Sequence, residues 1–283
     1  MGSIAIRQTG RTVVRVVTIV FLLGFAVAQL FPLLWLAIYS LQRSSDLFGP
    51  ELLRWPSDPQ WGNYVRAWVD GRIVRYFFNS LIVVGVAVVA VTVCAFLLSY
   101  SVARMRWRGR RLVYGFVMLG MVIPIHTTLL PNFLWFNRFG LIDTYAGLVI
   151  PYVAFNLSFS VLMFAGLLSS IPYSMEDSAF MDGARMTTTL TRIIAPMVRT
   201  GFVTVGVMAF LSGWNEFIMA NTFLASESKR TLPFSIIRFE GQYSSDYAVQ
   251  FAVMVIVALI PILLYFLFSR WVVAGVTAGA VKE

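Results

Sequence analysis

The sequence contains few charged residues and almost none of the side chains that bind metals or form disulfides. Charged residues make up 12% of its 283 residues, against about 25% in an ordinary soluble domain. The single cysteine, Cys94, excludes an internal disulfide, and its apolar surroundings predict a small buried side chain. The single histidine, His126, excludes a histidine-cluster metal site and is expected to pack or to form a local hydrogen bond.

Motifs that would indicate an enzyme or an ion-driven carrier are also missing. The sequence has no G-x-x-x-x-G-K-[ST] stretch, in which backbone N–H groups and a lysine hold nucleotide phosphates. Its apolar segments carry no chain of paired acids and bases, and no clear internal repeat is visible. We therefore expect no catalytic residue, metal site or cofactor in this chain, and ATP could drive it only through another subunit.

Apolar residues dominate what remains. They make up 59% of the chain, and the mean hydropathy is +0.79. These values predict an all-α membrane protein that crosses the bilayer several times. A basic tail over residues 1–15 precedes the apolar region 16–273, and a short tail over residues 274–283 follows it. The six predicted transmembrane helices are 16–41, 77–103, 112–133, 145–168, 197–223 and 248–273.

The net charge of +9 is concentrated on one side of these predicted helices. Thirteen of the 22 lysine and arginine residues, but only four of the 13 acidic residues, lie on the side of the N-terminus. The positive-inside rule makes that side cytoplasmic, together with both termini and the loop between the fourth and fifth helices. Lipid headgroups explain the basic residues, and nucleic-acid binding is not needed.

That loop, residues 171–196, is too polar and too long to be a turn. Pro172 can open a helix because its missing N–H falls where helix N–H groups have no partner. Ser174 and Asp177 have the spacing of a capping box, and Glu176 adds negative charge near the helix N-terminus.

Four residues of the loop have the spacing of one helix face. Their side chains are small, except for one aromatic ring. The four residues are Ala179, Phe180, Gly183 and Ala184. Gly183 would let another surface approach this face closely, at a cost of about 1 kcal/mol in helix stability. The simplest alternative is an amphipathic helix that lies on the membrane without a partner.

The same loop resembles the cytoplasmic loop of ABC importer permeases, whose pattern is E-A-A, three residues, G, nine residues, I-x-L-P. Asp177-Ser178-Ala179 stands at the E-A-A, Gly183 at the glycine, and Ile193 and Pro196 at the last two landmarks. The departures are Asp177 for Glu, Ser178 for Ala and Ala195 for Leu. Asp182-Gly183-Ala184 fits the form of the motif that is common in sugar permeases.

The resemblance implies that this loop forms coupling helices that dock into a groove of a separate ATPase, which would bind ATP and Mg²⁺. Phe180 and Gly183 would carry the docking contact, while Glu176 and Asp177 would hold the helix start and could pair with basic residues of the ATPase. The expected coupling residues are Glu176, Asp177, Ser178, Ala179, Phe180, Asp182, Gly183, Ala184, Ile193 and Pro196.

The segment Trp214-Asn215-Glu216-Phe217 resembles one that sugar-importer permeases carry at the same distance after the coupling loop. An acid inside a span costs about 2.5 kcal/mol or more, so Glu216 should face a partner, water or a cavity. Two interpretations remain open. The segment lines the substrate path, with Trp214 stacking on a sugar ring, or Trp214 is interfacial and Glu216 hydrogen-bonds a neighbouring helix. Asn156, in the fourth predicted helix, could likewise face the path or pack.

Asn79-Ser80, at the start of the second predicted helix, is expected to hydrogen-bond other helices. With this pair and the C-terminal tail, the resemblance covers nearly the whole chain. The chain is similar to the permease subunit of a carbohydrate-type ABC importer, most like the second permease of the maltose system.

The resemblance implies a bacterial-type inner (plasma) membrane and uptake of a sugar or oligosaccharide by alternating access. It implies as partners a second permease subunit in a heterodimer, two copies of the ATPase and an extracytoplasmic substrate-binding protein. Two other classes stay open. An ion-gradient-driven carrier or channel would not co-purify with an ATPase, and a membrane scaffold would show no substrate-dependent ATPase stimulation.

Overall fold

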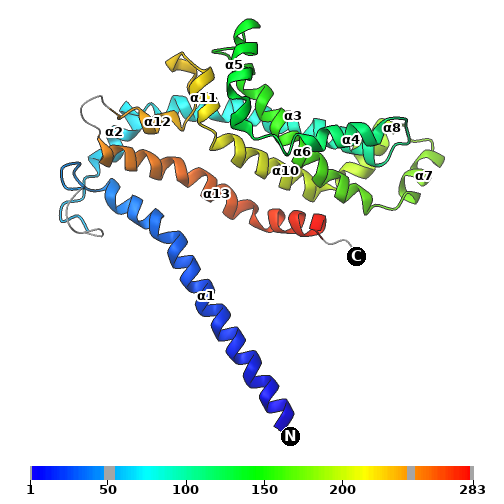
Figure 1. The fold of residues 1–283 in the computed structure, drawn as a ribbon, viewed down its shortest axis with the longest axis horizontal. Helices are drawn as coiled ribbons and strands as arrows, with labels where there is room; N and C mark the ends of the chain where they lie inside the picture. The colour runs from blue at the N-terminus through cyan, green and yellow to red at the C-terminus, as the bar shows by residue number, and fades with distance from the viewer. Residues whose placement is uncertain (1, 48–54, 241–245, 281–283) are drawn as a thin grey trace. The chain divides into compact units, whose positions relative to one another are not determined.

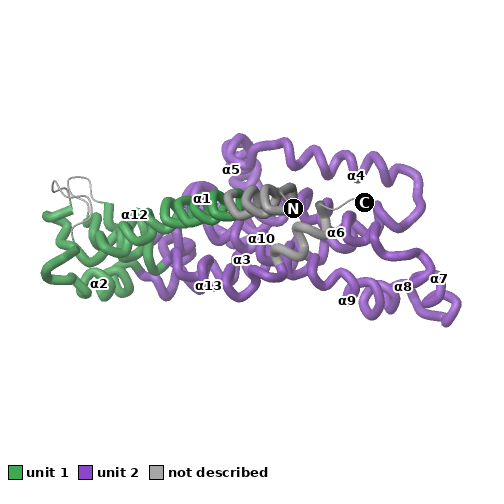
Figure 2. Tube along the Cα trace, turned by 90° about the horizontal axis from the view of Figure 1, so that it is seen from below, with its two compact units in different colours: residues 1–71, 236–256 green, residues 72–235, 257–283 purple. Residues whose placement is uncertain are grey.

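The computed structural model describes the backbone of residues 2–47, 55–240 and 246–280, and the side chains of residues 14–47, 55–240 and 246–271 (Figure 1). Within these ranges the regular elements are helices, and none is a β-strand. The chain divides into two compact units (Figure 2). Unit 1 contains Met1–Gly71 and Ile236–Ile256, and unit 2 contains Arg72–Ser235 and Val257–Glu283.

Unit 1 contains α1 (Gly2–Ser40), α2 (Gly62–Asp70) and the first turns of α13 (Tyr247–Ala280). Its small core packs Trp35 and Phe251 at 5.3 Å between ring centroids, edge to face. Asp246, just before α13, forms an ion pair with Arg66 of α2 at 2.5 Å.

Unit 2 holds the remaining helices. The first group is α3 (Ile73–Ala103), α4 (Arg110–Leu119), η1 (Ile125–Thr128), α5 (Leu129–Arg138) and α6 (Ala146–Ser169). The second group is α7 (Ser174–Met181), α8 (Met186–Thr188), the π-helix η2 (Thr189–Ile194), α9 (Ala195–Met197), α10 (Arg199–Trp214), α11 (Ile218–Phe223) and η3 (Glu227–Lys229). The short α12 (Phe234–Ile237) crosses the boundary between the units.

The core of unit 2 lies where α3, α6 and α10 pack together. Phe96, Phe164 and Phe202, one from each helix, form an aromatic cluster with centroid distances of 5.0–5.6 Å. At Gly201 an added Cβ would lie 2.5 Å from Leu167 Cδ1. The missing side chain therefore lets α10 approach α6 closely.

Four of the described helices are long and apolar enough to cross a membrane: Val14–Ser40, Ile73–Ala103, Ala146–Ser169 and Tyr247–Trp271. A fifth candidate is the pair Met186–Met197 and Arg199–Trp214, which is bent by 77°. Six continuous spanning helices, as the sequence predicts, are therefore not confirmed.

The third predicted helix, 112–133, is interrupted between α4 and α5. Pro124 has an extended backbone conformation, and a proline cannot continue the hydrogen-bonding pattern of the helix that precedes it. An added Cβ at Gly120 would lie 2.4 Å from Ser158 Oγ, whose hydroxyl donates to the carbonyl oxygen of Val117 at 2.7 Å. The end of α4 is thus held against α6 where α4 stops.

Other expectations also change. The helix α1 begins at Gly2, so most of the predicted tail 1–15 belongs to it, and α13 continues into the predicted tail 274–283 as far as Ala280. The last three residues of that tail lie outside the described residues. Cys94 is exposed on α3 rather than buried.

Candidate functional site

The predicted coupling loop forms several short helices, and its first helix, α7, starts without the expected capping box. Tyr173, the residue before α7, already has a helical backbone conformation, and no side chain caps the helix. Ser174 is the first residue inside the helix, one position too late to act as the cap. The capping-box prediction is therefore wrong, although Glu176 and Asp177 do lie in the first turn.

The end of α7 is a Schellman motif that depends on Gly183. The Gly183 N–H donates to Phe180 O at 3.0 Å, and the Ala184 N–H donates to Ala179 O at 2.9 Å. Gly183 has φ +78°, a left-handed conformation that side chains disfavour. Gly183 and Ala184 thus lie beyond the helix, so they do not share a helical face with Ala179 and Phe180. An added Cβ on Gly183 would meet no atom of the described chain within 4 Å.

The outward face of α7 is apolar with acidic residues beside it. The side chains of Phe180 and Met181 are 44% and 87% exposed. Asp177, Ser178 and Asp182 are also exposed, whereas Ala179 is buried against the rest of unit 2. The helix therefore has an inner side that packs on the protein and an outer side free to contact another molecule.

The last predicted coupling residues lie after α7. Ile193 is half-buried in the π-helix η2, and Pro196 is exposed in α9. Single π-helical turns inside longer helices are frequent at functional sites. Here the π-helix precedes the 77° bend that joins the coupling loop to α10.

Glu176 points inward. Its carboxylate accepts hydrogen bonds from Arg104 Nε at 2.7 Å and from Tyr100 Oη at 2.8 Å. In this conformation the carboxylate is thus held inside unit 2, and Asp177 and Asp182 are the acidic residues that face outward. Sequence reasoning missed Tyr100 and counted Arg104 only among the thirteen basic residues on the predicted cytoplasmic side, because no local pattern distinguishes the one that is buried.

The predicted path residues are occupied by contacts inside the protein. Trp214 is 1% exposed and stacks on Phe210 at 5.0 Å between ring centroids. Asn215 is exposed, and its Nδ2 donates to the carbonyl oxygen of Leu211 at 2.9 Å. Asn156 Nδ2 donates to the carbonyl oxygen of Tyr152, on its own helix, at 2.8 Å. In this conformation the ring of Trp214 is not open to a ligand.

Glu216 connects three segments of unit 2. Its Oε2 accepts a hydrogen bond from Tyr152 Oη of α6 at 2.7 Å. Its carboxylate also accepts the N–H groups of Met219 at 2.7 Å and of Ala220 at 3.1 Å. These N–H groups belong to the first turn of α11, which has no intrahelical partners for them. The interpretation in which Glu216 hydrogen-bonds a neighbouring helix thus matches the geometry.

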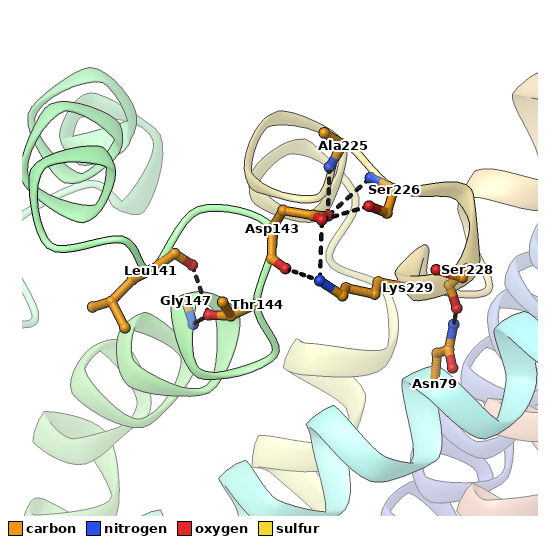
Figure 3. Close-up of polar contacts among 9 residues, drawn as sticks. All are labelled: Asn79, Leu141, Asp143, Thr144, Gly147, Ala225, Ser226, Ser228 and Lys229. Atoms are coloured by element: carbon orange, nitrogen blue, oxygen red, sulfur yellow. Dashed lines mark hydrogen bonds and ion pairs between the residues drawn. The ribbon is translucent and has the colours of Figure 1, made fainter.

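A polar network just before the start of α6 was not predicted (Figure 3). Asp143 has φ +58° and accepts hydrogen bonds from the N–H groups of Ala225 and Ser226 at 3.1 and 2.8 Å. Its Oδ2 also accepts from Ser226 Oγ at 2.5 Å and forms an ion pair with Lys229 at 3.0 Å. The network ties the loop before α6 to the segment that follows α11.

Asn79 extends this network to the start of α3. Its amide Nδ2 donates to the carbonyl oxygens of Ser228 and Arg230, each at 2.8 Å, and its Oδ1 accepts from Tyr145 Oη at 2.8 Å (Figure 3 shows the Ser228 contact). The neighbouring Ser80 Oγ accepts the Leu232 N–H at 2.8 Å. The predicted Asn79-Ser80 contacts therefore exist, mainly with the backbone of the short helix η3 and of the segment after it rather than with another long helix.

Replacing Asp143 by asparagine is expected to destabilise the protein by about 2 kcal/mol at neutral pH, as typical for hydrogen bonds to a charged group. The hydrogen bonds from Ser226, helped by Lys229, lower the pKa of Asp143 from 3.8 to about 2. A lowered pKa stabilises the folded state above pH about 4, and this stabilisation is lost as the pH falls through about 2.

Thermal unfolding in detergent at several pH values checks this expectation. The Asp143→Asn protein should unfold roughly 4–8 °C lower at pH 7, and this difference should shrink below pH 4. Asp58→Asn is the control, because Asp58 pairs with Arg43 at 2.8 Å on the surface, where such pairs contribute about 0–1 kcal/mol. Equal unfolding temperatures for Asp143→Asn and the unaltered protein would contradict the stabilising role of the network.

Comparisons with known proteins connect the chain to a family. Residues 95–277 match the family described as "Binding-protein-dependent transport system inner membrane component". The trehalose transport system permease protein SugB of Mycobacterium tuberculosis (strain CDC 1551 / Oshkosh) is 31% identical over 255 residues, or 89% of this chain and 92% of that protein. The diacetylchitobiose uptake system permease protein NgcG of Streptomyces coelicolor (strain ATCC BAA-471 / A3(2) / M145) is 29% identical over 263 residues, or 92% of this chain and 87% of that protein.

A solved structure shows the same fold. It is a chain of a bacterial ABC transporter involved in the import of the acidic polysaccharide alginate, with a TM-score of 0.78 and 22% sequence identity. The alignment covers 90% of this chain and 94% of that chain. The matched family region spans more than half of the sequence, and the relatives align over most of it. The chain therefore belongs to the family of binding-protein-dependent transport system inner membrane components, the permease subunits of ABC importers.

Proposed function

We propose that this chain forms half of the translocation pathway of an ATP-driven importer for a sugar or oligosaccharide. The family assignment favours an importer permease over an ion-driven carrier or a membrane scaffold. The substrate class is supported by the relatives, whose names refer to trehalose and diacetylchitobiose. The identity of the sugar would depend on the extracytoplasmic binding protein and the partner permease.

In the proposed assembly this subunit pairs with a second, different permease in the inner membrane. Two copies of an ABC ATPase bind ATP and Mg²⁺ on the cytoplasmic side, and an extracytoplasmic protein delivers the substrate. Both termini and α7 would face the cytoplasm, as the distribution of basic residues indicates. The interrupted α4–α5 segment and the bent pair ending in α10 would complete six crossings, since non-helical backbone is tolerated in a membrane where protein covers it.

The observation that carries the proposal is the outward face of α7. Phe180 and Met181 of α7 are exposed. The helix α7 is a short helix that follows the end of α6 (Figure 1). A groove on the ATPase would cover these side chains, and closure of the ATPase dimer on ATP would move α7. Because α3, α6 and α10 pack on one another, movement of α7 would reach the helices of the pathway.

Replacing Phe180 by aspartate tests the docking face. The affinity-tagged Phe180→Asp chain is co-expressed with its partner permease and ATPase and then purified. The amount of ATPase that co-purifies with it should be lower than with the unaltered chain by a factor of about ten or more. A buried aromatic anchor typically contributes 2 kcal/mol or more to an interface. Phe139→Asp is the matched control, because Phe139 is 65% exposed in the loop after α5, before α6 begins. Full retention of the ATPase by the Phe180→Asp chain would contradict docking on α7.

A further inference from the structure

A buried ion pair joins the first turn of α7 to the end of α3. The side chains of Arg104 and Glu176 are 2% and 8% exposed, and Arg104 Nε lies 2.7 Å from Glu176 Oε1. Tyr100, one turn earlier on α3, donates its hydroxyl to Glu176 Oε2 at 2.8 Å. Every other ion pair among the described residues has both side chains at least 26% exposed. This pair therefore differs in kind from the surface pairs of the molecule.

The guanidinium of Arg104, at the end of α3, contacts three successive segments later in the chain: the end of α6, the linker after it and α7. Arg104 is the residue at which α3 ends, and its backbone N–H still donates to Tyr100 O at 2.9 Å. Its Nη1 donates to the carbonyl oxygens of Leu168, in the last turn of α6, and of Ile171, in the linker to α7, at 3.3 and 2.8 Å. Its Cζ lies 3.8 Å from the centroid of the Tyr173 ring, which directly precedes α7. One side chain thus connects α3, α6, the linker and α7.

Stability alone does not explain this arrangement. Removing two charges from water costs several kcal/mol per ion, so a buried ion pair often contributes no more to stability than apolar side chains of similar size. The Nη2 group of Arg104 is also buried and has no hydrogen-bond partner in the described structure. A buried donor without a partner lowers stability further. The pair does fix the position of α7 relative to the end of α3. Apolar surfaces can slide over one another, whereas two paired charges resist separation.

From these contacts we propose that Arg104 is a positioning residue that carries the displacement of α7 to α3. The proposal rests on the proposed function, in which an ATPase moves α7. Along the chain, α7 is connected directly only to α6, through the four residues Ser170–Tyr173, and to α8. The Arg104–Glu176 pair adds a direct route to α3, a helix about 46 Å long at 1.5 Å per residue over its 31 residues. The far end of α3 carries Asn79 and Ser80, which hold the segment after α11.

The test replaces the pair by apolar side chains of similar size, in the double variant Arg104→Met with Glu176→Leu. This exchange removes both charges together, so neither is left buried without its partner. The side chain of Glu176 is 8% exposed and turned away from the outward face of α7, so we expect the protein to insert and to retain the ATPase, which is measured in parallel. The readout is a fluorophore on Cys94, which is exposed on α3 and is the only cysteine of this chain. The complex is assembled with cysteine-free partner subunits, and the change in fluorescence on adding ATP and vanadate is measured.

The unaltered complex should show an ATP-dependent change at Cys94, and the double variant should show a change at least fivefold smaller at equal ATPase retention. Arg106→Met is the matched control, since Arg106 is exposed two residues away, and it should keep the full signal. An unchanged signal in the double variant overturns the proposal, as does an absent signal in the unaltered complex that retains its ATPase. Failure of the unaltered chain to retain any ATPase would instead refute the proposed function.

A second variant decides the matter if the double variant does not insert. Tyr100→Phe removes a single hydroxyl that donates to Glu176 and leaves the ring in place. We expect normal insertion and a signal at Cys94 that is reduced about twofold. A signal equal to that of the unaltered complex would overturn the proposal.

Discussion

Replacing Gly183 by valine is expected to lower ATP-driven uptake at least tenfold while the protein still inserts into the membrane. At φ +78° a β-branched side chain is strained, by about 1–2 kcal/mol or more. Relief of this strain would break the hydrogen bonds from Gly183 and Ala184 that end α7. The outward side chains Phe180 and Met181 lie in the same turn, so their direction would change. Uptake by cells that express the whole importer, compared with the ATP hydrolysis of the purified complex, measures the loss of coupling.

Gly183→Asn separates the backbone requirement from the space requirement. Asparagine tolerates the left-handed conformation, so this variant should keep α7 properly ended. Since nothing in the described chain lies within 4 Å of an added Cβ, any large loss in the asparagine variant would come from a partner that approaches the glycine. Normal uptake by the valine variant would contradict the role of Gly183 in coupling.

Replacing Glu216 by alanine is expected to destabilise the protein by about 4 kcal/mol. The change leaves the hydroxyl of Tyr152, a buried residue, and the N–H groups of Met219 and Ala220 without the acceptor they have now. Each buried donor left unpaired costs about 1–3 kcal/mol. Thermal unfolding of the purified protein in detergent should show a midpoint lower by roughly 8 °C or more.

Glu216→Gln is the control for this expectation. The glutamine carbonyl can still accept at the start of α11, so the loss should be only about 1 kcal/mol. If the alanine variant unfolds at the normal temperature but takes up its substrate with altered affinity, Glu216 would be part of the substrate path instead. That outcome would favour the other interpretation that the sequence left open.

The coupling loop shows where local patterns mislead. Helical spacing places Gly183 and Ala184 on the face of Phe180, but the helix ends at Met181 and the glycine takes a left-handed conformation. The same spacing cannot tell that Glu176 points inward, since its direction depends on Arg104, 72 residues earlier in the sequence. The position of the loop between the fourth and fifth apolar segments, however, follows directly from its polarity.

Local patterns in the sequence were enough to predict a helical membrane protein, the spans near α1, α3, α6 and α13, and the family that the polar loop 171–196 resembles. These features depend on composition over about 20 successive residues and on short motifs, which are local properties of the chain. The burial and the hydrogen-bond partners of individual polar side chains could not be predicted in this way. These features depend on contacts between segments that lie far apart in the sequence. They include the burial of Arg104, the partners of Glu216, the break of the third segment beside Ser158 and the pairing of Asp143 with Lys229, 86 residues later. Such contacts exist only once α3, α6 and α10 have packed, because packing selects the partner of each buried polar group.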